Sequence, residues 1–264
     1  MLFSSPLAAA PAPAAASTAP AWIKDRLAYF ADPRFSFDPE PHEYRLGDRL
    51  LTSCTSWVKQ YKEPFYAAEI APKVAARTGQ TTEEVLAEWE RAAEIGTKTH
   101  KFIEDYYNAH LLGSSMPELY CGDGEVSLRC LKFLEIASSR LQCFEPIGQE
   151  IRMFHEASGL CGTLDFLAYH KERKEYWVVD WKSNKVIRTD SDRCYGNMLG
   201  EFSDLKDNEH NVYSLQISLY RLFLKSAGIA TAGGIIVHLP TNTISPAIYK
   251  TIDYTQRIST LTGI

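Results

Sequence analysis

Two apolar segments joined by a short charged turn set the strongest limit on how this chain can fold. The segments are "GTLDFLAYH" and "YWVVDWK", and "KERKE" lies between them. Large apolar residues on both sides of a polar turn predict an antiparallel β-hairpin. Asp165 and Asp180 are equidistant from the centre of the turn, so we expect them to be cross-strand neighbours on one face. Lys182 belongs to the same face as Asp180.

The facing acids Asp165 and Asp180 indicate a cation site, because two opposed carboxylates repel each other unless one is protonated or a cation lies between them. Mg²⁺ and Mn²⁺ prefer oxygen ligands and are typically held by one or two carboxylates and a substrate phosphate. A lysine beside the ion can orient or help to deprotonate the attacking water, and it can stabilise charge on the phosphate. The alternative is a turn-flanking acid at Asp165 and a solvated Asp180–Lys182 ion pair worth ~0–1 kcal/mol.

Helical periodicity predicts three longer helices in the chain. Apolar residues recur at helical spacing over residues 82–109, 124–141 and 212–228. Gly96 lies inside the first of these patterns, where glycine is unfavourable by up to ~1 kcal/mol relative to alanine. This glycine therefore marks either a helix break or a close approach of the backbone to a neighbouring element.

The other patterns are those of strands and turns. Residues 34–52 predict a β-hairpin with its turn near Gly47, followed by a helix that Ser53 or Thr55 caps. "GQEIRMFH", "GGIIVHL" and "AIYKTID" predict further strands, and the polar segment 189–211 predicts a loop. This order of elements predicts an α/β (α+β) fold, with a central mixed sheet that contains an antiparallel meander and is flanked by helices.

Composition limits the class of protein. The chain has 264 residues, 45% of them hydrophobic, which is enough for a single domain over residues 22–264, whereas the Ala/Pro-rich residues 1–21 are expected to be a disordered extension. No apolar run reaches the ~18 residues that a membrane span needs. The net charge of −5 argues against a protein that coats DNA, but not against a nuclease whose acids hold metal ions. Scattered cysteines and the lack of a secretory signal predict a cytoplasmic location, in the host cytoplasm if the source is a virus or phage.

Five short motifs carry a resemblance to a known superfamily. "GTLD" followed by "DWK" resembles the PD-(D/E)xK nucleases, specifically their RecB/lambda-exonuclease-like branch. "GTKTHKFIE", with Gly96, Thr97 and His100, resembles the upstream helix motif of this branch. "GQE" resembles its acidic position before the metal-binding strands, and "YSLQISLY" resembles its Q-x-x-x-Y motif. The motifs occur in the family order and span about residues 90 to 225.

The resemblance implies a restriction-endonuclease-like core and a metal-dependent nuclease. The expected reaction is hydrolysis of DNA phosphodiester bonds by an exonuclease in DNA recombination, repair or replication. Asp165, Asp180, His100 and the Trp181 carbonyl would hold one or two Mg²⁺ or Mn²⁺ ions, and Lys182 would lie beside the attacking water. Residues expected to be catalytic are Asp165, Asp180, Lys182, His100 and Glu150.

Other motif residues are candidates for binding the substrate. Gln216 and Tyr220 are one helical turn apart and either contact the substrate backbone or pack and share a hydrogen bond. Glu104 lies one turn beyond His100, where it can hold the other ring nitrogen or a water at the metal. Lys185 and Arg188 follow the second strand and are either phosphate contacts or part of a solvated loop.

Two other functions remain open at this stage. An RNA or structure-specific endonuclease uses similar residues, and a nucleic-acid-binding subunit can keep the fold without the chemistry. Some relatives carry an iron–sulfur cluster that needs three cysteines near the C-terminus. Here no cysteine follows Cys194, so no such cluster is expected.

Overall fold

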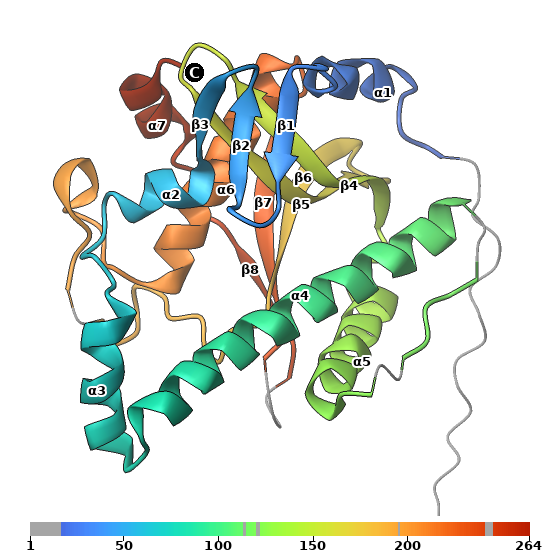
Figure 1. Ribbon diagram of the computed structural model, residues 1–264. Coiled ribbons are helices and arrows are strands. Elements are labelled where there is room, and N and C mark those ends of the chain that lie inside the picture. The colour runs from blue at the N-terminus through green and yellow to red at the C-terminus, as the bar shows by residue number, and fades with distance from the viewer. Residues whose placement is uncertain (1–16, 113–114, 120–121, 195, 241–244) are drawn as a thin grey trace, which may run out of the picture.

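A mixed β-sheet forms the centre of the protein, and helices cover both of its faces (Figure 1). The structure, a computed structural model, describes residues 17–112, 115–119, 122–194, 196–240 and 245–264. Within these ranges the sheet has eight strands in the order β1-β2-β3-β5-β6-β7-β8, with β4 paired to β5. The strands are β1 (Phe35–Asp38), β2 (Glu43–Leu46), β3 (Arg49–Ser53), β4 (Phe144–His155), β5 (Leu160–His170), β6 (Glu175–Lys182), β7 (Thr231–His238) and β8 (Ala247–Lys250).

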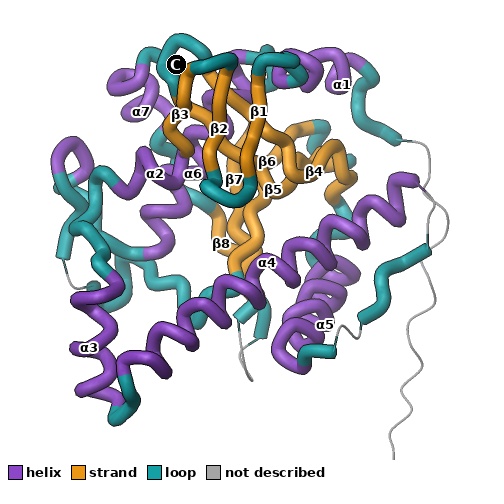
Figure 2. Tube along the Cα trace, viewed as in Figure 1, coloured by secondary structure: helices purple, strands orange, loops and turns teal. Residues whose placement is uncertain are grey.

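The helices form a layer on each side of the sheet. α4 runs diagonally across one face with α5 beside it, and α6 covers the other face (Figures 1 and 2). The α-helices are α1 (Trp22–Leu27), α2 (Cys54–Lys59), α3 (Ala67–Thr78), α4 (Thr82–Leu112), α5 (Gly124–Ser139), α6 (Glu209–Ser226) and α7 (Thr255–Thr262). The prediction of a mixed α/β fold with helices flanking a central sheet is therefore confirmed.

Strand β6 is buried along most of its length because it packs on both layers. Trp177, Val179 and Trp181 belong to the core with α4 and α5. Tyr176 and Val178 belong to the core with α6. Since successive side chains of a strand point to opposite faces, Asp180 lies on the α6 side of the sheet.

The predicted hairpin of β5 and β6 is confirmed, together with its register. Phe166 pairs with Val179, and the pairing continues to the turn. One step further from the turn, the same register sets Asp165 opposite Asp180, but the regular pairing ends before this position. The two acids therefore lie where β5 and β6 begin to separate.

This separation belongs to a fork in the sheet at β5. β4 pairs along one edge of β5 over its length. The other edge is shared, because β3 pairs in parallel with Leu160 and Cys161 whereas β6 pairs from Phe166 onward. Residues 162–165, the "GTLD" segment, lie between these two partners. The Asp165 side chain can therefore contact residues of elements outside the sheet.

Helix α4 is continuous through Gly96 and contacts the end of β6 there. A Cβ atom at Gly96 would lie 3.2 Å from the Oγ atom of Ser183, the residue that follows β6. The expected close approach at this glycine is confirmed, and the alternative of a helix break is wrong. The contact sets the middle of α4 against the separating ends of β5 and β6.

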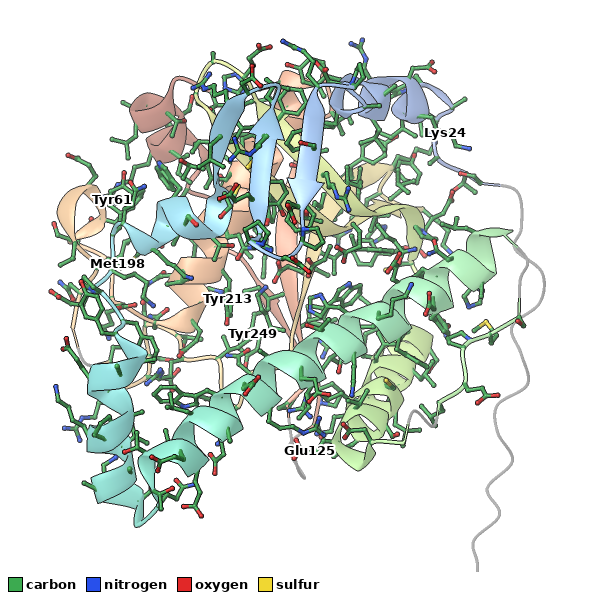
Figure 3. All side chains as sticks on the ribbon, viewed as in Figure 1. Lys24, Tyr61, Glu125, Met198, Tyr213 and Tyr249 are labelled. Atoms are coloured by element: carbon green, nitrogen blue, oxygen red, sulfur yellow. The ribbon has the colours of Figure 1, made fainter. Side chains whose placement is uncertain are left out.

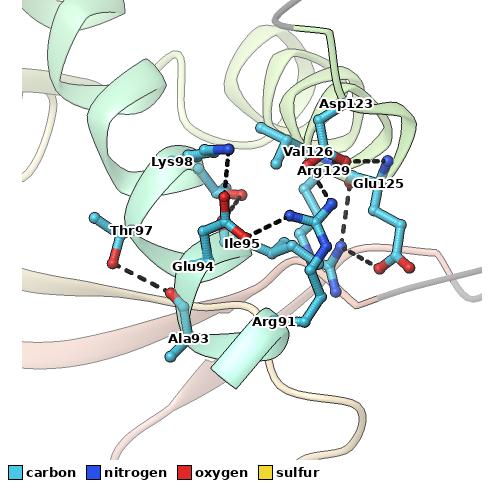
Figure 4. Close-up of polar contacts among 11 residues, drawn as sticks. Arg91, Ala93, Glu94, Ile95, Thr97, Lys98, Asp123, Glu125, Val126 and Arg129 are labelled. Carbon is cyan, nitrogen blue, oxygen red and sulfur yellow. Dashed lines mark hydrogen bonds and ion pairs between the residues drawn. The ribbon is translucent and has the colours of Figure 1, made fainter. Parts of the chain in front are cut away.

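A polar network links α4 to the start of α5 (Figure 4). Arg91 pairs with Glu94 in the same helix and with Asp123, the residue that caps α5. Lys98 pairs with the same Glu94, 2.6 Å away. Exposed pairs contribute little individually, but networks hold geometry better than isolated pairs. This network ties down the turns of α4 that precede His100.

The fold differs from the sequence prediction near both ends. Residues 34–52 form three strands rather than one hairpin, because the chain reverses between β1 and β2 as well as near Gly47. The short helices α3 and α7 were not predicted, since neither has an extended periodic pattern. Ser53 caps α2, as expected, by accepting the backbone N–H of Ser56. The 189–211 segment is mostly irregular, as expected, apart from a 3-10 turn at Gly200–Phe202 and the start of α6.

The N-terminal extension expected over residues 1–21 falls mainly outside the described residues, which begin at residue 17. The backbone N–H of Thr18 donates to the Glu145 carboxylate on β4 at 2.8 Å. A search of the described helices finds none with the length and apolar character to cross a membrane.

Candidate active site

Three ionisable side chains from three elements converge at the fork in the sheet. His100 of α4, Glu150 of β4 and Asp165 of β5 each offer one ligand atom, and these atoms lie within 4.8 Å of one another. Gln149 pairs with Phe166 and Ile151 with Leu164, so Glu150 stands opposite Asp165 between two regular pairs. The group therefore joins motifs that are 65 residues apart in the chain, from His100 to Asp165.

Glu150 has a strained backbone at this position. Its φ of 47° lies in the left-handed region, which disfavours residues other than glycine by about 1–3 kcal/mol. Burial, together with the charges of Asp165 and Glu104, raises the pKa of Glu150 to about 8. Because Glu150 is exposed to solvent, we attribute the raised pKa mainly to repulsion from the carboxylates of Asp165 and Glu104. Strain and crowded negative charge in one residue are typical of functional sites.

His100 faces two oxygen atoms. Its Nε2 lies 3.0 Å from the Trp181 carbonyl oxygen, and because a carbonyl only accepts, Nε2 carries the proton. Nδ1 lies 3.7 Å from Oδ2 of Asp165. If the ring is neutral, with its proton on Nε2, the lone pair on Nδ1 faces the Asp165 carboxylate, and the two groups repel each other. A proton on Nδ1 or a cation between the two groups removes the repulsion.

Asp165 is held in place by the neighbouring strand. Its Oδ2 accepts the backbone N–H of Trp181 at 3.0 Å. This bond stands where the regular β5–β6 pairing has ended, so a side chain takes over the role of a backbone carbonyl. It fixes the carboxylate next to the Trp181 carbonyl and His100.

Asp180 is fully buried beside Lys182. Its Oδ2 lies 2.6 Å from the Lys182 Nζ, but neither carboxylate oxygen has a hydrogen bond of regular geometry among the described residues. Burial raises the pKa of Asp180 to about 6, against the opposing charge of Lys182. A buried carboxylate with unfilled acceptor positions is costly, and a hard cation or a further donor would satisfy it.

Lys182 lies between acids and an aromatic ring. Burial lowers the pKa of its ammonium, but the charges of Asp180 and Asp165 more than offset this effect and the net shift is upward. The Nζ lies 4.8 Å from the centre of the ring of Tyr213, a residue labelled in Figure 3. Tyr213 extends from α6, so α6 holds the lysine from the face opposite to α4.

The donor set fits a hard divalent cation. Two carboxylates, an imidazole and a backbone carbonyl suit Mg²⁺ or Mn²⁺ better than a soft metal, and no thiol belongs to the group. Of the expected ligands, the structure brings His100, Asp165 and the Trp181 carbonyl together and adds Glu150. Asp180 instead faces Lys182, and its role as a metal ligand stays a prediction.

Gln216 and Tyr220 belong to α6 and pack against the site from the face of the sheet that α6 covers. The Gln216 Nε2 donates to the Tyr220 hydroxyl at 2.9 Å, and Tyr220 is buried. A Cβ at Gly162 would lie 2.8 Å from the Tyr220 ring, which is why the "GTLD" segment begins with glycine. These contacts match the packing alternative, and contact of either side chain with a substrate stays a prediction.

The remaining predicted substrate contacts differ in their surroundings. Lys185 is highly exposed, and its Nζ lies 3.8 Å from Oε2 of Glu88. Arg188 donates from Nε to Glu209 at 2.9 Å and from its backbone N–H at 3.0 Å, so it ties the loop to the start of α6. Glu104 lines a cleft beside His100 and pairs with Lys101, rather than with the imidazole.

A cleft of about 590 Å³ opens from these acids toward the β1–β2 hairpin. Four of its lining residues lie outside the five motifs found in the sequence: Phe37, His42, Tyr44 and Arg152. Arg152 had a usable signal, because it lies two residues after Glu150 in a predicted strand. The three aromatic residues had none, since only the tertiary fold sets β1 and β2 opposite α4.

Comparison of the sequence with models of known protein families finds no match. Comparison with curated proteins also finds none.

Proposed function

We propose that this protein is a metal-dependent nuclease of the PD-(D/E)xK type that hydrolyses DNA phosphodiester bonds. The observation that carries the proposal is the convergence of His100, Glu150 and Asp165 at the fork, beside the buried Asp180–Lys182 pair. Few structural roles call for three acids, an imidazole and a lysine around one point. Together with a nearby cleft, they are what a phosphoryl-transfer site requires.

The arrangement of elements also supports a restriction-endonuclease-like core. The antiparallel meander of β4, β5 and β6 is followed by helix α6 and by β7, which pairs in parallel with β6. The five family-like motifs lie on α4, β4, β5, β6 and α6. The motifs on α4, β4, β5 and β6 meet at the fork, and the motif on α6 packs against it.

The residues would divide the chemistry as follows. His100, Glu150, Asp165 and the Trp181 carbonyl would hold Mg²⁺ or Mn²⁺, with Asp180 as a further ligand. Such an ion supplies Lewis-acid chemistry, which activates water near neutral pH and offsets negative charge on a phosphate. Lys182 would donate a hydrogen bond to the phosphate or the attacking water, and Asp180 would hold the lysine in position.

We propose that the substrate is DNA with a free end, processed in recombination, repair or replication. The support is the likeness of the motifs to the RecB/lambda-exonuclease-like branch. Cleavage of RNA is the competing possibility, because the same residues can act on either phosphodiester.

The test uses purified protein with Mn²⁺ or Mg²⁺ and end-labelled linear DNA, closed circular DNA and RNA. We expect metal-dependent loss of linear DNA only, abolished by EDTA. Asp165→Asn and Lys182→Met should each reduce the rate by at least about 100-fold. Lys171→Ala, in the turn at the far end of the hairpin, is the matched control and should keep full activity. Absence of cleavage on all three substrates would contradict the proposal.

A further inference from the structure

We propose that the cleft between the β1–β2 hairpin and α4 binds a single DNA strand, with Arg152 at a phosphate and the hairpin aromatics at a base. The inference rests on the proposed function, because it places the strand next to the candidate metal centre. It adds the form of the substrate and the residues that select it.

The cleft has a floor and two walls of different chemistry. Thr163 of β5 and Arg152 of β4, which are cross-strand partners, form the floor. α4 contributes one wall, with His100 among its lining residues. The β1–β2 hairpin forms the opposite wall, and in Figure 2 its turn points toward the middle of α4.

The cleft is continuous with the candidate metal centre. His100 and Glu150 line it and also belong to the group of potential metal ligands. Arg152 and Thr163 are each two residues from a member of that group, Glu150 and Asp165. A strand whose scissile phosphate lies at the acids therefore passes Arg152 and Thr163 within a nucleotide or two.

Arg152 is exposed, and its charge lowers the pKa of Glu150, but it forms no ion pair with a carboxylate of the described residues. The three other arginines of this region are engaged: Arg34 pairs with Asp32, Arg45 pairs with Glu43, and Arg49 donates to the Glu156 carbonyl. Among the described residues no ion pair or hydrogen bond involves the Arg152 guanidinium, which lies 5.1 Å from the centre of the Phe37 ring. An unpaired guanidinium at the edge of an acidic site suits a phosphate of the incoming strand.

The hairpin presents a ready-made aromatic wall. Phe37 lies 4.5 Å from Tyr44 and 5.1 Å from His42, measured between ring centres. The Tyr44 hydroxyl is 2.9 Å from Thr163 Oγ1, so the wall is fixed to the floor. His42 is exposed. Unpaired bases stack on such rings and on guanidinium planes, with about 1–3 kcal/mol per base.

The volume of the cleft and the stacking wall favour the binding of one strand over a duplex. Its volume of about 590 Å³ lies in the range of ~300–1,000 Å³ in which proteins enclose a single small molecule. That space accommodates one or two nucleotides. Stacking on the hairpin also requires an unpaired base, which a duplex does not offer.

The test measures binding apart from cleavage. Fluorescence anisotropy of a labelled twelve-nucleotide oligo-dT is recorded with the full chain in EDTA, where no hydrolysis takes place. We expect Arg152→Ala to weaken binding by at least about 10-fold and to reduce the slope of log affinity against log salt by about one. Phe37→Ala should weaken binding without changing that slope. Arg152→Lys should restore much of the salt dependence.

Arg45→Ala is the matched control, because Arg45 is on the same hairpin but alternates with Tyr44 to the opposite face. Equal binding by Arg152→Ala and Arg45→Ala, with both variants folded by thermal melting, would overturn the inference. So would equal affinity for single-stranded and duplex DNA, or tighter binding of oligo-U than of oligo-dT. The proposed function fails separately, if the wild type binds the strand but cleaves nothing with any metal.

Discussion

At the scale of single residues, Asp180 is a position that costs stability. A carboxylate with no exposure and one ionic partner is less stable than a well-packed apolar side chain in its place. The residues of β6 between its ends are otherwise large and mostly apolar, and Asp180 is the one acid among the buried positions of the strand. The strand therefore retains an expensive pair where the candidate site needs charge.

The Asp180–Lys182 pair should be strongly coupled in stability. Lys182→Met leaves Asp180 buried without its counter-ion, and we expect a loss of about 2–4 kcal/mol in the free energy of unfolding. This is less than the ~3–5 kcal/mol typical of fully buried pairs, because the Lys182 side chain is 19% exposed. The double variant Asp180→Ala/Lys182→Met should be more stable than the sum of the single losses predicts, by at least about 1 kcal/mol. Urea denaturation measures all four proteins, and additive losses would contradict the coupling.

His238, on β7 behind the site, should make stability depend on pH. Its Nε2 donates to the Asn184 carbonyl at 2.7 Å. Burial lowers the pKa of His238, Lys132 and Arg129 lower it further, and the bond to Asn184 opposes them. Because the folded-state pKa lies below the unfolded value of ~6.5, this contribution is complete above that pH and is lost as the pH falls.

The corresponding variant is His238→Gln, which keeps an N–H donor but does not titrate. We expect the melting temperature of the wild type, relative to that of the variant, to fall between pH 7.5 and pH 5.5. Thermal denaturation in matched buffers measures this difference. A difference that does not change with pH would show that His238 takes up its proton equally well in the folded state.

At the scale of elements, the parts that sequence predicts are those with local rules. The β5–β6 register follows from a short symmetric turn, and the long amphipathic helices follow from their periodicity. The β4–β5 register also has a short turn, so the opposition of Glu150 and Asp165 was within reach. The aromatic wall was not, because the position of β1 and β2 across the cleft from α4 depends on how β3 joins β5 over a hundred residues later.

The contact of α4 with the end of β6 gives a prediction at this scale. Gly96→Ala should be neutral or stabilising by up to ~1 kcal/mol, because alanine is the better helix former and its Cβ meets only the mobile hydroxyl of Ser183. Gly96→Leu should push α4 away from β6 and separate His100 from the Trp181 carbonyl. We expect Leu to reduce nuclease activity by at least about 10-fold and Ala to preserve it. Equal activity of the two variants would show that this helix contact does not position the site.

At the scale of the whole molecule, both helical layers contribute side chains to the candidate site at the fork in the sheet. α4 supplies His100 from one side, and α6 supplies Tyr213 and Tyr220 from the other. The candidate metal centre is thus assembled by tertiary structure and does not exist in the unfolded chain. An ion that binds there should stabilise the folded state as a whole.

Mn²⁺ at about 100 times its dissociation constant should raise the free energy of unfolding by about 2.7 kcal/mol. We expect the melting temperature to rise by several degrees, measured by differential scanning calorimetry with and without EDTA. Asp165→Asn should abolish the rise. Asp105→Asn, an exposed acid on the same helix as His100 but outside the ligand group, should keep it. The same rise in Asp165→Asn would place the metal elsewhere.

The fork at β5 also determines when the candidate centre can form during folding. The fork is complete only when residues 52–53 pair with residues 160–161 and the β5–β6 hairpin is in place, and the ligand group also needs His100 of α4 to reach it. Joining such distant segments is slow compared with forming a hairpin or a helix. We expect the ligands to come together late, near the end of folding. Under the proposed function, a chain that is still being synthesised would carry its acids without a working centre, and would not cleave nucleic acids until its fold is complete.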